Sequence, residues 1–165
     1  MNIIAAVDRN WGIGRGGKLL VSIPKDMAFF REETRGKVIL MGRNTLRSLP
    51  GGQPLFGREN IILSRDKNFK VKGGTVVSSV EAALAYIKEK KFEDADVFVI
   101  GGESVYRAFL PHCDIAHITF IDYAYEADRH LPNLDQDPDW HLVLETEEET
   151  YFDLAYTFRL YKRYD

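Results

Sequence analysis

An acidic side chain, Asp26, stands where a helix is expected to begin and where its neighbours are apolar. Pro24 suits the first turn of a helix, because its missing N–H would have no partner there. Ile23 precedes Asp26 by three residues, and Phe29 and Phe30 follow it by three and four, so all three share its helix face. Removal from water disfavours a charged carboxylate. The segment therefore predicts an acid that binds a cationic ring or handles a proton, although attraction to the positive end of the helix dipole would also explain it.

A glycine-rich segment, residues 12–17, follows the first apolar run and formally satisfies the G-x-G-x-x-G fingerprint of dinucleotide-binding folds. In that fingerprint the glycines open a helix, and an acid ends the second strand about 20 residues later. Here the glycines lead into a non-helical apolar run, and the second strand ends at Arg43, a base. We therefore expect a long, mobile loop over a cleft rather than a Rossmann fold.

Glycines and basic residues end three other predicted strands. Gly101 and Gly102 separate a buried strand from a helix, where backbone N–H groups can approach a phosphate, although a plain strand-to-helix turn would look the same. Arg43 follows a second strand, and Arg65 follows a third. Open α/β sheets bind ligands beyond the carboxyl ends of their strands, and an arginine fork matches phosphate oxygens. The three strand ends together indicate a polyanionic cofactor, with both arginines suited to an adenosine 2′-phosphate.

The segments that must position these residues alternate between buried strands and helices. Short apolar runs predict strands over residues 3–7, 38–41, 60–63 and 97–100. Helices are predicted over residues 24–34, after Arg43, over 80–90 with Ser79 as the cap, and over 103–110 before Pro111. A strand over 115–121 is followed by two long strands, 140–147 and 152–161, joined by an acidic turn. This order predicts one α/β domain, residues 1–165, with a mainly parallel sheet and a C-terminal antiparallel hairpin that closes one edge.

The composition argues against several classes of function. A net charge of −3 and a pI near 5.8 give no overall basic field, so neither nucleic acid nor an anionic membrane is expected as a partner. The single cysteine allows no intrachain disulfide, and the four histidines show no ligand spacing, so no metal site is expected. The first apolar run fails as a signal peptide, and no apolar stretch is long enough to span a membrane. We expect a soluble, cytoplasmic protein.

Beyond these patterns, the chain resembles dihydrofolate reductases over nearly all of its length. The similarity lies in Ile23-Pro24-x-Asp26-Met27, Met41-Gly42-Arg43-x-Thr45, Pro54-Leu55-x-Gly57-Arg58, Ile100-Gly101-Gly102 and Thr119-x-Ile121-Asp122, in this order and spacing. The resemblance implies a three-layer fold with helices on both faces of the sheet and a monomeric, NADPH-dependent enzyme. It also implies reduction of 7,8-dihydrofolate to 5,6,7,8-tetrahydrofolate, by hydride transfer to C6 with protonation of N5, in support of one-carbon metabolism and thymidylate synthesis.

The same resemblance assigns residues to the two ligands. Asp26, supported by Thr119, would hydrogen-bond the 2-amino group and N3 of the pterin. The remaining substrate residues would be Ile4 and Ile100 through their carbonyls, Met27, Phe30, Leu49 and Leu55 as walls, and Arg58 on the α-carboxylate of the glutamate tail. NADPH would lie along Ala6, Ile13, Gly14, Arg15, Gly16, Gly17, Lys18, Gly42, Arg43, Asn44, Thr45, Leu63, Ser64, Arg65, Ile100, Gly101, Gly102, Glu103, Ser104, Val105 and Tyr106. Asp128 would latch the mobile segment through the backbone near residues 14–16.

One position departs from the family pattern. Val21 stands where the family commonly has a tryptophan, whose indole N–H holds an ordered water near the pterin and the acid. Valine has no donor for this water, whereas hydride transfer itself should survive. Two other functions stay open at this point. One is a sibling reductase acting on a ribosylated pyrimidine, which would need a sugar-phosphate site in place of the folate walls. The other is a non-catalytic nucleotide-binding module.

Overall fold

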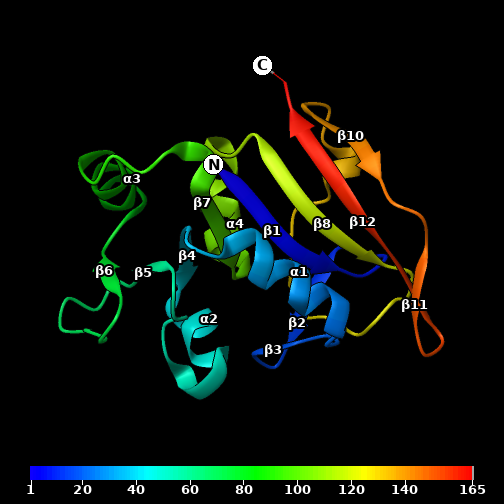
Figure 1. Ribbon diagram of the computed structural model, residues 1–165, viewed down its shortest axis with the longest axis horizontal. Helices are drawn as coiled ribbons and strands as arrows, with labels where there is room; N and C mark the ends of the chain where they lie inside the picture. Colours follow the sequence, from blue (N-terminus) through cyan, green and yellow to red (C-terminus); the bar gives the residue numbers. More distant parts are fainter. Residues whose placement is uncertain (165) are drawn as a thin grey trace.

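The computed structural model describes residues 1–164, and its centre is a nine-stranded sheet (Figure 1). The strands lie in the order β10-β12-β8-β1-β7-β4-β5-β6, with β11 paired to β12. All strands from β8 to β6 in this order are parallel, whereas β12 is antiparallel to β8, β10 and β11. Their bounds are β1 Asn2–Val7, β4 Val38–Gly42, β5 Glu59–Leu63, β6 Thr75–Val77, β7 Val97–Gly101, β8 Ile115–Ile121, β10 Trp140–Glu145, β11 Glu149–Tyr151 and β12 Leu154–Arg163. The predicted α/β sheet with a C-terminal antiparallel hairpin is confirmed.

Within residues 1–164 four α-helices pack around this sheet (Figure 1). Their bounds are α1 Pro24–Thr34, α2 Arg43–Ser48, α3 Val80–Glu89 and α4 Glu103–Phe109, and short 3-10 turns are η1 Pro50–Gly52, η2 Asp94–Asp96, η3 Leu110–His112 and η4 Leu134–Gln136. Pro24 lies in the first turn of α1, and Ser79 caps α3 by accepting a hydrogen bond from the Ala82 N–H at 3.0 Å. Both helix starts follow from residue type, as predicted. None of the helices in this part of the chain has the length and apolar character needed to cross a membrane.

Alternate residues of the central strands enter two different cores. In β4, Val38 and Leu40 pack with residues of α3 and α4, whereas Ile39 and Met41 pack with residues of α1 and α2. Successive side chains of a strand point to opposite faces, so a strand buried on both faces reads as a continuous apolar run. The three layers, with helices on both faces of the sheet, are therefore present. Asp26 lies on α1 and contacts β8, so it is found where this helix packs on the sheet.

The glycine-rich segment after β1, predicted as a long, mobile loop, contains a β-hairpin, so the prediction of a loop throughout was wrong. Strands β2 (Gly12–Arg15) and β3 (Lys18–Leu19) pair with each other, and β9 (Arg129–His130) pairs with the other edge of β2. Gly16 and Gly17 form the turn with φ angles of 60° and 80°. Two-residue hairpin turns favour positive φ at both central positions, which glycine adopts without a steric penalty. The paired glycines were the sequence signal for this hairpin.

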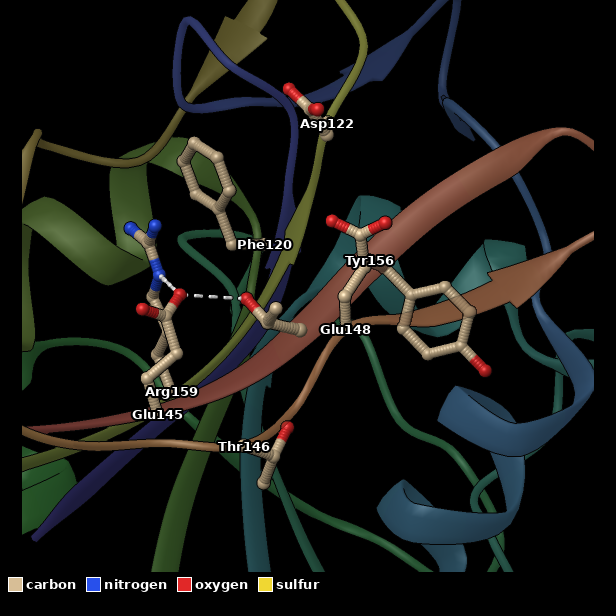
Figure 2. Close-up of a pocket in the computed structure, with 8 residues that line it drawn as sticks. Phe120, Asp122, Glu145, Thr146, Glu148, Tyr156 and Arg159 are labelled. Carbon is tan, nitrogen blue, oxygen red and sulfur yellow. Dashed lines mark hydrogen bonds and ion pairs between the residues drawn. The ribbon is translucent and has the colours of Figure 1, made fainter.

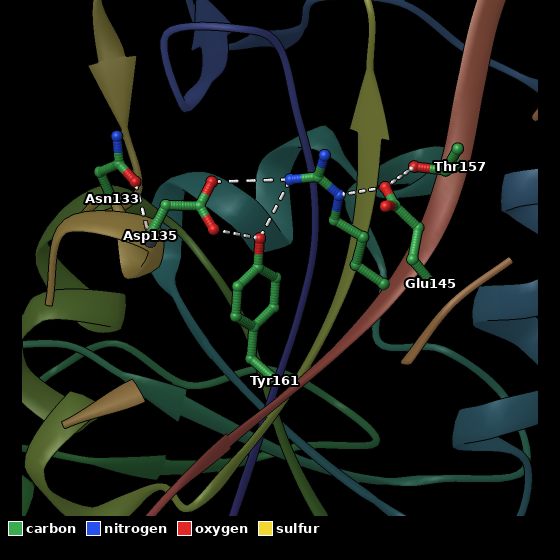
Figure 3. A network of polar contacts seen from close by, with 6 residues as sticks. Asn133, Asp135, Glu145, Thr157 and Tyr161 are labelled. Atoms are coloured by element: carbon green, nitrogen blue, oxygen red, sulfur yellow. Dashed lines mark hydrogen bonds and ion pairs between the residues drawn. The ribbon is translucent and has the colours of Figure 1, made fainter. Parts of the chain in front are cut away.

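The acidic segment between the two C-terminal strands contains β11, which the sequence analysis did not predict. Strand β12 is long enough to pair with β11 near its start and with β10 near its end. A polar network crosses β12 at Arg159 (Figure 3): its Nε donates to Glu145 Oε2 at 2.6 Å, and its guanidinium donates to the Tyr161 hydroxyl at 3.1 Å. Tyr161 in turn donates to Asp135 Oδ1 at 2.8 Å. The network ties β10 and η4 to β12 and so fixes this edge of the sheet.

Candidate active site

Asp26 lies in the first turn of α1 and meets Thr119 of β8. The Thr119 hydroxyl, on a residue that is only 2% exposed, donates to Asp26 Oδ1 at 2.5 Å. Desolvation raises the pKa of Asp26 above its ordinary value, and the hydrogen bond from Thr119 offsets part of this rise. Asp26 itself is half-buried, so part of its carboxylate is accessible. This arrangement can bind a planar ring that presents N–H donors or a positive charge.

The sheet opens close to Asp26, between β1 and β7. The pairing of these strands ends at Ile3 and Val99, and the next residue of β7, Ile100, lies at a shift in the register between β7 and β4. Backbone groups beyond this point need other partners, because unpaired polar groups are costly to bury. One such group, the Ile4 carbonyl, accepts a hydrogen bond from the Tyr106 hydroxyl at 2.8 Å. The opening lies at the carboxyl ends of the strands, where open α/β sheets bind their ligands.

Apolar residues predicted as walls gather around the core between the sheet and α1. Phe30, Leu49, Leu55 and Ile100 are all partly exposed and pack against the buried cluster that contains Ile4. The fourth predicted wall residue, Met27, is half-buried on α1, whereas Ile100 was predicted to contribute its backbone carbonyl. Partly exposed apolar side chains on a packed core form the usual lining of a small-molecule site. These residues can therefore hold a flat aromatic ligand against the sheet.

Arg58 is held in one orientation by three hydrogen bonds. Its Nε donates to the Thr34 hydroxyl at 3.0 Å, and its two terminal nitrogens donate to the carbonyls of Phe56 at 2.8 Å and Arg31 at 3.0 Å. A guanidinium has five N–H donors, so two remain for a ligand. Desolvation lowers the pKa of Arg58, as do the positive charges of Arg35 and Arg31, yet arginine stays charged near neutral pH. The fixed fork suits a carboxylate.

A second group of site residues lies at the ends of β4 and β5. Arg43 stacks on the Phe69 ring at 4.1 Å and pairs with Asp66 at 3.4 Å. Its Nε is buried and has no hydrogen-bond partner among residues 1–164. Beside it, Ser64 is 9% exposed, whereas Arg65 is exposed. Gly42, Asn44, Thr45 and Leu63 complete the predicted residues of this edge. An anion at this place would satisfy the buried donor of Arg43.

The turn between β7 and α4 combines glycine with free helix amides. At Gly101 the φ angle is 126°, and an added Cβ would lie 3.3 Å from the Thr45 hydroxyl, so only glycine fits without strain. The first intrahelical bond of α4 joins the Tyr106 N–H to the Gly102 carbonyl, and no side chain caps the helix start. The amides of the preceding residues, among them Val105, therefore lack intrahelical acceptors. The side chains of Val105 and Tyr106 belong to the core, at 5% and 3% exposure, so these two residues offer mainly backbone to a ligand.

The β2–β3 hairpin is attached to the segment before β9. The Gly16 N–H donates to Asp128 Oδ2 at 3.0 Å, and the Asp128 N–H donates to the Gly14 carbonyl at 3.0 Å. The expected contact of Asp128 is thus present, and an ion pair of Arg15 with Glu126 accompanies it. Glu103 of α4 joins the same region, since its Oε1 accepts the His130 N–H at 2.6 Å. The hairpin follows the carboxyl end of β1, and its Ile13 packs against the main core cluster.

Comparison with known proteins decides the family. The sequence model of the family described as dihydrofolate reductase matches residues 1–163. The chain is 33% identical to the dihydrofolate reductase of Staphylococcus haemolyticus over 99% of its own length and 95% of the relative's. It is 36% identical to that of Neisseria gonorrhoeae over 96% of its own length and 94% of the relative's. The chain belongs to the dihydrofolate reductase family.

The structural comparison agrees with the sequence comparison. The fold matches a dihydrofolate reductase from Enterococcus faecalis, solved in complex with NADP(H) and RAB-propyl, with a TM-score of 0.86 and 32% identity. The match covers 99% of this chain and 96% of the other. The protein is thus an NADP-dependent oxidoreductase of the dihydrofolate reductase class, as the sequence predicted. This finding sets aside the pyrimidine reductase and the non-catalytic module.

Some features near the site were not predicted from the sequence. Lys25, the neighbour of Asp26, forms an ion pair with Glu149 of β11. A hollow with an acidic lining lies along β12 and does not include Asp26 (Figure 2); its residues are Phe120, Asp122, Glu145, Thr146, Glu148, Tyr156, Thr157 and Arg159. Within the described residues no three His, Cys, Asp or Glu side chains are placed to hold a metal ion.

Proposed function

We propose that Asp26 is the catalytic residue for reduction of 7,8-dihydrofolate to 5,6,7,8-tetrahydrofolate by NADPH. The observation that carries this proposal is the contact of the half-buried, desolvated Asp26 carboxylate with Thr119, beside the opening of the sheet between β1 and β7. A carboxylate in this setting gains most from a partner that is cationic or rich in donors, because it has lost much of its hydration. The pterin ring, with its 2-amino group and N3, is such a partner.

The rest of the substrate is bound by residues of α1 and of the segment after α2. Met27, Phe30, Leu49 and Leu55 form the apolar walls for the pterin and the benzoyl group, and the carbonyls of Ile4 and Ile100 face the ring. Arg58 holds the α-carboxylate of the glutamate tail with the two N–H groups that Thr34 and the backbone leave free. Because the Arg58 guanidinium is already held in one orientation, it loses little conformational entropy when it binds a carboxylate.

The residues along the strand ends fit NADPH. The buried, unpartnered Nε of Arg43 and the uncapped start of α4 are suited to phosphate oxygens. Arg65 is exposed at the same edge and suits the 2′-phosphate. The glycines at 42, 101 and 102 let the backbone approach the cofactor, and the β2–β3 hairpin covers it. When bound, NADPH supplies the hydride that passes to C6 of dihydrofolate.

The protein contributes alignment and charge. Asp26 is the acid that we assign to the pterin end of the site, and the proton for N5 reaches the substrate through water. Asp26 acts mainly by favouring the cationic, N5-protonated pterin. The walls and the hairpin exclude bulk water, which strengthens this interaction.

A steady-state assay tests the proposal. NADPH absorbance should fall when dihydrofolate is added and should stay constant without it, and a folate antagonist should compete with dihydrofolate. A parallel assay with NADH measures the preference that Arg43 and Arg65 confer. Absence of NADPH oxidation in the presence of dihydrofolate would refute the proposal. A monomeric state, lack of nucleic-acid binding and a cytoplasmic location stay predictions, and size-exclusion chromatography tests the first.

A further inference from the structure

The β11–β12 hairpin is attached to the first turn of α1, next to Asp26. Lys25 forms an ion pair with Glu149 Oε1, which joins two segments far apart in the sequence. The other carboxylate oxygen of Glu149, Oε2, is buried and has no hydrogen-bond partner among residues 1–164. A buried acceptor without a donor is costly, so its surroundings should hold a group able to donate to it.

Tyr156 is placed to be that donor. It is the direct cross-strand partner of Glu149 in the β11–β12 pairing, so both side chains lie on the same face of the hairpin. Tyr156 is 3% exposed and packs in one apolar cluster with Ile23 and Val21, which lead into α1. Its ring extends away from the other labelled side chains of the hollow and toward α1 (Figure 2). The phenol therefore lies between the hairpin and the helix turn that carries Asp26.

The charged groups that act on the Tyr156 hydroxyl come from two elements. Glu149 lies on β11, and Lys25 and Asp26 lie on α1; the other side chains of the cluster are apolar or are tyrosines. Burial raises the pKa of Tyr156, and the negative charge of Glu149 raises it further; Lys25 opposes this rise, and Asp26 adds the smallest increase. The hydroxyl thus keeps its proton at neutral pH. The hydroxyl can donate one hydrogen bond, and the carboxylates of Glu149 and Asp26 are the two possible acceptors.

We propose that Tyr156 is a positioning residue for the reaction, whose hydroxyl is shared between the carboxylates of Glu149 and Asp26. Donation toward Asp26 through one water supports the ionised form of the acid, whose Oδ1 already accepts from Thr119. Glu149 competes for the same proton, and Lys25 limits this competition by holding the other oxygen of Glu149. The inference rests on the proposed role of Asp26 and names a second group that sets its ionisation. Tyr156 would also supply a hydrogen-bond donor near Asp26, which the side chain of Val21 lacks.

Three variants test the proposal: Y156F, E149Q and the double variant. The readout is the pH profile of kcat/KM for dihydrofolate, together with kcat and KM measured separately. Y156F removes a donor to the carboxylate, so the apparent pKa of Asp26 should rise by about half a unit, the size expected for one neutral hydrogen bond. E149Q weakens the competing acceptor, so the apparent pKa should fall. The double variant should behave like Y156F alone, because Glu149 acts only through the hydroxyl.

Y151F is the matched control, since Tyr151 lies in the same hairpin and the same apolar cluster. Its pH profile should equal that of the unmodified protein. Equal profiles for all variants, or additive shifts in the double variant, would overturn the inference. If Y156F does not fold, the downward shift of E149Q alone decides, and its absence would count against the inference. An unmodified protein that oxidises no NADPH would instead refute the proposed function, so the two failures are distinguishable.

Discussion

Replacing Asp26 by Asn separates the catalytic use of this residue from its effect on stability. Asn keeps the shape and can still accept the Thr119 hydroxyl, whose present bond to Asp26 is 2.5 Å long, but it carries no charge. At neutral pH we expect turnover to fall about 10²–10⁴-fold, the usual range for loss of a positioned acid or base, while NADPH binding stays nearly intact. At acid pH part of the activity should return, because the substrate is then already protonated.

The same substitution should stabilise the folded protein. Desolvation raises the pKa of Asp26 in the folded state, so folding favours its protonated form. Below the ordinary aspartate pKa both states are protonated, and the variant and the original protein should be equally stable in this respect. As pH rises through the window between the ordinary and the raised pKa, the original protein alone loses stability, by about 1.4 kcal/mol for each unit of the rise. For a chain of this size 1 kcal/mol corresponds to about 2–4 °C in Tm.

Thermal melts at pH 3 and pH 7, combined with the steady-state assay, measure both effects. We expect a gain in Tm for D26N at pH 7 and little difference at pH 3. Unchanged turnover would refute the catalytic role. A lower Tm at pH 7 would refute the argument that this carboxylate is held at a cost to stability.

Three further substitutions test other parts of the site. T119V removes the donor to Asp26 in similar volume, so the pKa of Asp26 should rise and KM for dihydrofolate should increase about tenfold; an unchanged pH profile of kcat/KM would contradict this. R58Q should raise KM for dihydrofolate about 10–100-fold with KM for NADPH unchanged, and a dihydropterin without the tail, measured in parallel, should show no effect. G101A places a Cβ 3.3 Å from the Thr45 hydroxyl at a φ of 126°. Thermal melts should show a loss of about 1–3 kcal/mol in stability, and NADPH titrations should show weaker cofactor binding. Wild-type values in both measurements would show that the turn accepts a Cβ without strain.

The amino-acid sequence by itself determined the elements and most of the residues with chemistry. Apolar runs of β-branched residues predicted the parallel strands, since such runs fit strands buried on both faces. Pro24 and Ser79 located two helix starts through the chemistry of their backbone and side chain. Asp26 was found from the apolar neighbours on its own helix face, which is local information. Motif order then pointed to the family, which the comparisons confirmed.

The tertiary structure decided the contacts between residues distant in sequence. The donation of the Thr119 hydroxyl to Asp26 depends on how α1 packs on the sheet, as do the bonds of Arg58 to the Thr34 hydroxyl and the Arg31 carbonyl, and no spacing in the sequence encodes them. Lys25 and Glu149 gave no signal, because each reads as an ordinary surface charge until the hairpin is folded against α1. Local sequence patterns indicate which secondary structure a segment forms and which of its residues are buried. Which polar groups face one another is set by the packing of whole elements, and that packing determines the ionisation of the acid in the site.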